Sequence, residues 1–293
     1  MIEIQCQPEV IGIKLMKMLY VEVMGIPTRC VVAGEESAPA IMLLHGLALT
    51  SEVWMHNIES LARTHRVIAP DMLGHGFTKP VDTASVDVSA KIRHLEGLAN
   101  ALKLDVFSVC GSSYGALLAS LLYLANPNRI RKLIINGSGS CFNTEEQLKD
   151  QVSKMLTVYA PDKISYSSRT VWRERIGNNF FDIKKIPEEL LLIAQLCYAQ
   201  PWPALRLAET LSTMQDPERF RPYRILERLE NITCPTLVFW GRDDRGGSLE
   251  SAEKAVSRLP NGRVVVFDDC GHYPMIEHPE EYNRCASDFL AET

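Results

Sequence analysis

The sequence predicts an α/β fold: a mostly parallel, eight-stranded sheet with helices on both faces and one helical insertion. Short apolar runs rich in β-branched residues alternate along the chain with longer segments of helical periodicity, which is typical of parallel strands joined by helical crossovers. The 293 residues are 46% hydrophobic, which is enough to bury a full core in one domain with an insertion. The alternation stops in one interval, residues 143–231, and this marks the insertion.

The expected strands and helices follow one another in a regular order. An antiparallel hairpin opens the chain, with strands at 19–22 and 27–32 on either side of Met24-Gly25. The remaining strands are expected at residues 40–45, 66–70, 106–110, 132–135, 236–240 and 263–267. The helices between them are expected at residues 58–64, 89–102, 114–126, 249–258 and 279–291.

The insertion has helical spacing and no clear strand, and six prolines divide it into short helices. We therefore expect an α/β core formed by residues 1–142 and 232–293, with residues 143–231 as a helical cap inserted after the sixth strand. A cap in that position would cover the loops at the carboxyl ends of the strands and exclude water from a site there.

The strongest chemical signal is a Gly-x-Ser-x-Gly turn at Gly111, Ser113 and Gly115, between an apolar strand and an apolar helix. Small residues on both sides let the backbone turn sharply and hold the Ser113 hydroxyl above the sheet edge. The helix that follows points its N-terminus at that hydroxyl, where partial positive charge stabilises a developing anion. This context predicts that Ser113 is a nucleophile.

A serine nucleophile needs a base and a carboxylate that orients the base, and hydrolases with this turn carry them in the order Ser, Asp or Glu, His. Asp244 lies on the loop after the strand 236–240, and His272 lies on the loop after 263–267. Because functional groups gather at the carboxyl ends of parallel strands, Ser113, Asp244 and His272 are predicted to form a catalytic triad. Three further acids near these loops remain alternatives to Asp244: Asp243, Asp268 and Asp269.

The loop after the third predicted strand is expected to supply an oxyanion hole. The backbone N–H groups of Leu47 and of Tyr114, the residue after the nucleophile, can together hold a tetrahedral oxyanion. His45 and His75 are interpreted as structural residues that brace the neighbouring turns. Trp54, further along the same loop, is expected to line the substrate pocket.

Landmarks along most of the chain resemble those of α/β-hydrolase-fold serine hydrolases. They are residues 44–46 (Leu-His-Gly), 67–76 (Val-Ile-Ala-Pro-Asp-Met-Leu-Gly-His-Gly), 111–115 (Gly-Ser-Ser-Tyr-Gly), 241–244 (Gly-Arg-Asp-Asp) and 270–279 (Cys-Gly-His-Tyr-Pro-Met-Ile-Glu-His-Pro). Within that fold the chain most resembles the branch that contains the meta-cleavage-product hydrolases and related small-molecule carboxylesterases. In that branch the fourth residue of a Gly-x-x-Asp turn is the triad acid, which favours Asp244 over Asp243.

Four positions depart from the pattern of the meta-cleavage hydrolases. That pattern has Asn before the serine, Met after it, Trp after the histidine and a cap arginine for the substrate carboxylate; these positions hold Ser112, Tyr114, Tyr273 and Ala194 here. We therefore expect hydrolysis of a small, largely hydrophobic carboxylic ester, with Ser112 and Tyr273 beside the pocket. Two alternatives stay open: a carbon–carbon bond hydrolase of the meta-cleavage type, and a non-catalytic small-molecule receptor on the same fold.

Composition and charge argue against several other function classes. The net charge of −5 gives no basis for binding nucleic acid or an anionic membrane. The longest apolar run, residues 116–124, is too short to span a bilayer, and residues 1–6 do not open a signal peptide. The eight cysteines contain no Cys-x-x-Cys pair, which predicts buried thiols in a cytoplasmic protein with no metal. The expected partner is a small-molecule substrate, and no cofactor is expected.

Overall fold

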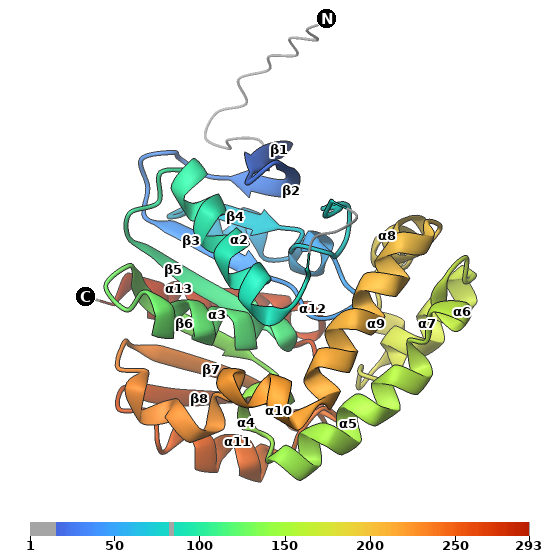
Figure 1. Ribbon diagram of the computed structural model, residues 1–293. Coiled ribbons are helices and arrows are strands. Elements are labelled where there is room, and N and C mark those ends of the chain that lie inside the picture. The colour runs from blue at the N-terminus through green and yellow to red at the C-terminus, as the bar shows by residue number, and fades with distance from the viewer. Residues whose placement is uncertain (1–15, 82–84, 293) are drawn as a thin grey trace, which may run out of the picture.

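The computed structural model describes residues 16–81 and 85–292, so the expectation for residues 1–6 lies outside the described residues. Their strands form one eight-stranded sheet in the order β1-β2-β4-β3-β5-β6-β7-β8 (Figure 1). The strands are β1 (Lys17–Val23), β2 (Ile26–Ala33), β3 (Ala40–Leu44), β4 (Arg66–Pro70), β5 (Phe107–Ser112), β6 (Ile130–Asn136), β7 (Thr236–Gly241) and β8 (Gly262–Phe267).

The strand directions confirm the predicted, mostly parallel sheet. β1 pairs antiparallel with β2, and β2 pairs antiparallel with β4. The other five pairings, from β3–β4 to β7–β8, are parallel. The carboxyl ends of β3 to β8 therefore meet at one edge of the sheet, where the loops after β5, β7 and β8 carry Ser113, Asp244 and His272.

Helices cover both faces of the sheet, as the alternation of elements predicts. α2 (Val88–Ala101) and α3 (Tyr114–Ala125) lie in front of the sheet in Figure 1, and α13 (Pro279–Ala291) lies behind it. The remaining core helices are α1 (Ile58–Leu61), α4 (Gly139–Phe142), α11 (Leu249–Val256) and α12 (Pro274–Glu277), with a 3-10 turn η1 (Ser51–Trp54). α3 directly follows Ser113 and is buried along nearly all of its length, so the nucleophile loop rests on a helix that is packed deep in the core.

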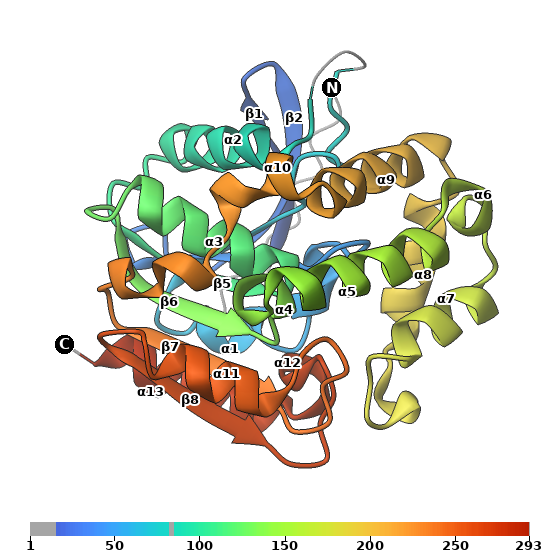
Figure 2. The same ribbon diagram turned by 60° about the horizontal axis from the view of Figure 1, so that its bottom comes forward.

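Residues 143–231 are all described, and they form helices and turns without a strand. We call them the helical insertion. After α4 (Gly139–Phe142) come α5 (Glu145–Val158), α6 (Pro161–Ile164), α7 (Arg169–Gly177), η2 (Ile183–Lys185), α8 (Glu188–Cys197), α9 (Pro201–Gln215), α10 (Pro217–Phe220), η3 (Arg221–Tyr223) and η4 (Leu226–Asn231). A capping box between Thr144 and Gln147 fixes the start of α5. Figure 2 shows α5 to α9 gathered at the end of the molecule toward which β6 points.

Most element boundaries differ from the sequence expectation by one to three residues, as at β5 and α1. β5 begins at Phe107 and continues to Ser112, two residues past the predicted end, while Val106 is 56% exposed and lies outside the strand. The helix expected at 58–64 ends at Leu61, because a turn follows it and leads directly into β4. The longer β5 matters for the site, since regular pairing then reaches the residue before the nucleophile.

The cysteine thiols of the described residues are unpaired, and all but Cys285 are buried: Cys30, Cys110, Cys141, Cys197, Cys234 and Cys270. Cys6 lies outside the described residues. A search of the described helices found none with the length and apolar character that crossing a bilayer requires.

Candidate active site

Ser113 sits on a strained turn between β5 and α3. Its backbone adopts φ 54° and ψ −118°, a conformation that costs about 1–3 kcal/mol and is typical of functional positions. The flanking glycines make the turn possible. A Cβ on Gly111 would lie 2.4 Å from the carbonyl carbon of Gly115, and a Cβ on Gly115 would lie 2.3 Å from the Leu44 carbonyl oxygen. Ser113 itself is partly exposed, between the buried Ser112 and Tyr114.

Asp244 and His272 form a buried hydrogen-bonded pair. His272 Nδ1 lies 2.8 Å from Asp244 Oδ2 and 2.9 Å from Oδ1, and the Gly246 N–H donates to Oδ1 at 2.7 Å. The carboxylate therefore fixes the proton on Nδ1 and leaves Nε2 as the basic nitrogen. Burial acts against the imidazolium, but the charge and hydrogen bond of Asp244, together with the Glu277 charge, outweigh it, and the pKa of His272 is raised.

Of the four candidate acids near these loops, Asp244 is the one that contacts His272. Asp268 instead pairs with the exposed Arg242 at 2.6 Å. The choice of Asp244 over its neighbours, which the Gly-x-x-Asp turn favours, thus agrees with the geometry of the pair.

Residues 137 and 138, at the end of β6, connect Ser113 to the Asp244–His272 pair. The Ser138 hydroxyl donates to the Ser113 carbonyl oxygen at 2.7 Å. Gly137 has a positive φ of 43°, and a Cβ there would lie 2.8 Å from Asp244 Oδ2 and 3.1 Å from His272 Nδ1. The described residues contain no hydrogen bond between Ser113 and His272. Bonds of this kind often tighten only when substrate binds.

The predicted oxyanion donors lie beside the nucleophile. A Cβ on Gly46 would come within 3.3 Å of the Ser113 Cβ, so the loop that carries Leu47 packs directly on the nucleophile turn. Tyr114 is the first residue of α3, so its N–H has no partner within the helix. Within the described part of the chain, the Leu47 N–H also forms no backbone hydrogen bond. Two N–H groups are thereby available at the site.

A buried histidine and a buried ion-pair network hold the loop that carries Leu47. His45 Nε2 accepts from the Met72 N–H at 3.0 Å, so His45 braces two loops as the sequence predicts. Nearby, the buried Asp71 carboxylate accepts from the N–H groups of Ser51 and Phe77 at 2.9 Å each. Arg29 pairs with Asp71 at 3.1 Å and also binds Glu52. The network joins β2 to the loops after β3 and β4.

The three residues predicted to line a pocket are all buried, and they lie in different surroundings. Tyr273 packs edge-on against the His272 ring with 5.1 Å between ring centroids. Ser112 is fully buried at the end of β5, and its hydroxyl has no hydrogen-bond partner among the described residues. Trp54 is fully buried in the main hydrophobic core. Ala194, at the position of the cap arginine, is buried in α8.

Glu277 is a structural contributor that the sequence analysis did not assign. Its Oε1 accepts from the Gly271 N–H at 2.9 Å, and its Oε2 accepts from the Phe181 N–H at 2.9 Å. The His272 N–H in turn donates to the Asn179 carbonyl at 2.7 Å. Burial raises the pKa of Glu277 even though these N–H groups favour the carboxylate. The turn between α7 and η2 is therefore bonded to the His272 loop. The sequence signal for this role was an acidic residue, Glu277, that directly follows the apolar residues Pro-Met-Ile.

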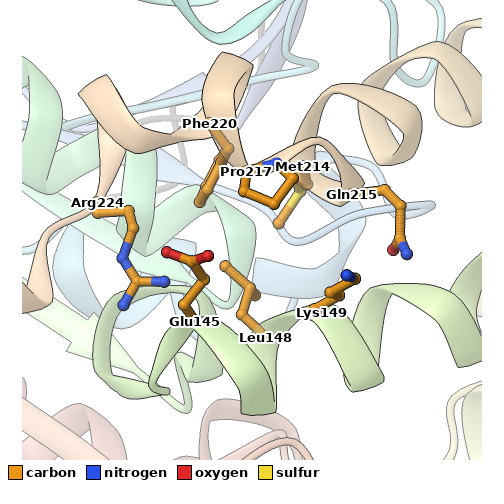
Figure 3. Close-up of a pocket in the computed structure, with 8 residues that line it drawn as sticks. All are labelled: Glu145, Leu148, Lys149, Met214, Gln215, Pro217, Phe220 and Arg224. Atoms are coloured by element: carbon orange, nitrogen blue, oxygen red, sulfur yellow. The ribbon is translucent and has the colours of Figure 1, made fainter.

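A separate small pocket lies within the helical insertion and contains none of the predicted site residues. Figure 3 shows it between α5 and the α9–α10 region. Its lining residues are Glu145, Leu148, Lys149, Met214, Gln215, Pro217, Phe220 and Arg224. Its cavity volume of about 10 Å³ is roughly the space of one water molecule. The described residues also contain no cluster of three side chains suited to hold a metal ion.

Comparison with curated proteins gives a consistent group of relatives. A 2-hydroxy-6-oxononadienedioate/2-hydroxy-6-oxononatrienedioate hydrolase of Paraburkholderia xenovorans (strain LB400) is 28% identical over 269 residues, which cover 87% of this chain and 88% of the relative. A 2-hydroxymuconate semialdehyde hydrolase of Pseudomonas putida is 29% identical over 264 residues, 88% of each chain.

Solved structures and a family model agree on the fold. The 2-hydroxy-6-oxo-6-phenylhexa-2,4-dienoate hydrolase from Rhodococcus sp. strain RHA1 is similar with a TM-score of 0.81 at 23% identity, covering 95% of this chain and 100% of that one. A serine hydrolase involved in carbazole degradation has a TM-score of 0.79 at 25% identity, covering 94% and 99%. The family model described as alpha/beta hydrolase fold matches residues 39–279. The chain therefore belongs to the alpha/beta hydrolase family.

Proposed function

We propose that the protein is a serine hydrolase that works through an acyl-enzyme on Ser113. His272 Nε2 removes the hydroxyl proton as Ser113 attacks a carbonyl carbon, and Asp244 stabilises the imidazolium. The N–H groups of Leu47 and Tyr114 hold the oxyanion, each contributing about 3 kcal/mol of barrier lowering. His272 then protonates the leaving group, and a water molecule activated by the same histidine releases the acyl group. The Asp244–His272 hydrogen bonds are the observation that carries this proposal.

We further propose that the bond cleaved is the carbon–carbon bond of a 2-hydroxy-6-oxo dienoate. The support comes from relatives that are named as hydrolases of such compounds, whose alignments cover 85% or more of this chain. In such a substrate the dienol first tautomerises: the 2-hydroxyl loses a proton and C5 takes one, which leaves C5 as a CH2 group beside the C6 ketone. Ser113 would then attack C6, and the C5–C6 bond would break with its electron pair delocalised through the C3–C4 double bond onto the 2-oxo oxygen. Water then releases the C6 fragment as a carboxylic acid. This reading replaces ester hydrolysis, the expectation from sequence, as the first candidate.

The test is the turnover of 2-hydroxy-6-oxo-6-phenylhexa-2,4-dienoate, the compound named for a relative from Burkholderia cepacia. Cleavage removes the aryl ketone from the conjugated system, so loss of the substrate's absorbance measures the reaction. We expect Ser113→Ala to lower the rate by about a thousandfold or more, as for other triad nucleophiles. Ser257→Ala, on the exposed end of α11, is the matched control and should react like the wild type. Equal rates for wild type and Ser113→Ala would reject the mechanism.

Ester hydrolysis remains the second candidate because of particular residues. Ser112, Tyr273 and Ala194 differ from the meta-cleavage pattern, and the buried, uncharged Ala194 offers nothing to a substrate carboxylate. A p-nitrophenyl ester series from acetate to decanoate measures this activity with the same two variants. Rapid Ser113-dependent ester cleavage without dienoate turnover would favour a carboxylesterase. Tight ligand binding without turnover of either substrate would favour the receptor reading.

A further inference from the structure

A fully buried lysine lies under the helical insertion, next to the nucleophile turn. Lys91, on α2, is 0% exposed, and its Nζ donates to the Thr210 hydroxyl on α9 at 3.0 Å and to the Val86 carbonyl. The ammonium also lies 5.9 Å from the centre of the Tyr114 ring. Figure 1 shows α9 passing beside α2 and α3. The cation is therefore held where the insertion meets the core.

Two other buried polar groups belong to side chains next to Lys91. The Tyr114 hydroxyl and His75 Nε2 are both buried, and neither has a hydrogen-bond partner among the described residues. Their rings are stacked, with 6.3 Å between centroids and 23° between planes. His75 Nδ1 lies 3.3 Å from the Leu73 carbonyl oxygen, which places the proton on Nδ1 and leaves Nε2 as an acceptor. Tyr114 thus offers a donor and His75 an acceptor.

The charge of Lys91 is incompletely balanced by its surroundings. No ion pair within the described residues includes Lys91, and the charges that act on it are Glu209 and Asp87, opposed by Arg206. Burial lowers the pKa of Lys91 to about 7, and burial with the Lys91 charge lowers the pKa of His75 well below 6.5. Burying an unpaired charge is costly unless an opposite charge approaches it. A carboxylate at this point would complete the hydrogen bonds of the ammonium.

We infer that Lys91, the Tyr114 hydroxyl and His75 Nε2 form a subsite for the head group of a 2-hydroxy acid. The carboxylate would bind the Lys91 ammonium, and the 2-hydroxyl would accept from Tyr114 and donate to His75 Nε2. The inference rests on the proposed dienoate substrate, which carries this head group, and it assigns to Lys91 the anchoring role that Ala194 lacks. Because Tyr114 directly follows Ser113, the subsite fixes the acid end of the substrate relative to the nucleophile.

The experiment measures competitive inhibition of p-nitrophenyl butyrate hydrolysis by 2-hydroxyhexanoate and by hexane-1,2-diol, which lacks the charge. For the wild type we expect the inhibition constant of the acid to be about tenfold or more below that of the diol, the effect of one charge-assisted hydrogen bond. Lys91→Met should bring the ratio to about one. Lys154→Met, an exposed lysine on α5, is the matched control and should keep the wild-type ratio.

Thermal unfolding would reveal whether Lys91→Met folds. If it does not fold, a second variant tests the subsite. Tyr114→Phe removes only the hydroxyl, and we expect it to weaken 2-hydroxyhexanoate relative to hexanoate, which has no 2-hydroxyl. Equal inhibition constants for acid and diol in the wild type would overturn the subsite. A wild-type preference for the acid over the diol that persists in Lys91→Met would also overturn the subsite. The assay needs only ester turnover, so loss of the charge preference and failure to cleave the dienoate are distinguishable results.

Discussion

Glu277 Oε2 lies 2.9 Å from the backbone nitrogen of Phe181, and this hydrogen bond helps to join α12, which follows the His272 loop, to the helical insertion. The same carboxylate accepts from the Gly271 N–H on its other oxygen. Replacement by alanine would remove this acceptor from the N–H groups of Gly271, Phe181 and Asp182. We expect Glu277→Ala to lower the free energy of unfolding by about 2–4 kcal/mol and to lower kcat as His272 loses its anchorage. Denaturant unfolding and steady-state kinetics measure the two effects.

Two further variants give this prediction its controls. Glu277→Gln keeps one acceptor oxygen, so its loss of stability should be smaller than that of Glu277→Ala. Glu174→Ala removes an exposed carboxylate from α7 in the same insertion and should change the unfolding free energy by no more than about 0.5 kcal/mol. If Glu277→Ala were as stable and as active as Glu174→Ala, the proposed connection between the insertion and the His272 loop would be wrong.

Arg29 is predicted to be essential for stability because it neutralises two acids, one of them fully buried. Asp71 has no exposed surface and Glu52 is mostly buried, so Arg29→Met leaves uncompensated charge in the core. The expected loss is about 3–5 kcal/mol of unfolding free energy. Arg242→Met breaks the exposed Arg242–Asp268 pair and should cost about 0–1 kcal/mol. Similar losses in the two variants, measured by chemical denaturation, would contradict this account.

The sequence predicted the sheet and the order of Ser113, Asp244 and His272 because these features depend on local patterns. An apolar strand followed by a glycine-bounded turn identifies its own position along the chain. Glu277 and Gly137 were not assigned, because their roles depend on contacts with Phe181 and Asp244, which are remote in sequence. The group formed by Lys91, Tyr114 and His75 was missed for the same reason. It is assembled from α2, α3 and the loop after β4, and α9 contributes a hydrogen-bond partner of Lys91.

The pH dependence of kcat/KM should report on His272. Asp244 raises the pKa of His272 above 6.5, and only the neutral ring can accept the Ser113 proton. Activity should therefore fall as the pH drops through a midpoint above 6.5. Asp244→Asn removes the charge, so the midpoint should move to lower pH and kcat should fall by about 10⁴-fold. A pH–rate profile with an unchanged midpoint would exclude Asp244 as the partner of His272.

The same pair contributes to stability with a defined sign. A raised folded-state pKa means that protonated His272 is favoured by folding. The contribution is therefore fully present below the unfolded value of about 6.5 and is lost as the pH rises through the higher folded value. Thermal unfolding measures the stability of wild type and of Asp244→Asn across this range. The part of their stability difference that comes from the protonation of His272 should disappear at alkaline pH.

Gly137 is predicted to matter because it leaves room for the Asp244–His272 pair. An alanine Cβ would lie 2.8 Å from Asp244 Oδ2 and 3.1 Å from His272 Nδ1, distances that require one of these groups to move. We expect Gly137→Ala to lower kcat by about a hundredfold, the effect of a displacement of about 1 Å in a catalytic group. Gly25→Ala supplies the matched control, because Gly25 also has a positive φ (+80°) but has no atom within 4 Å of the added Cβ. Both variants carry the backbone strain of alanine at positive φ, so both should lose stability, and only Gly137→Ala should lose turnover. Equal turnover in the two variants would mean that the pair tolerates displacement and that its observed geometry does not limit the reaction.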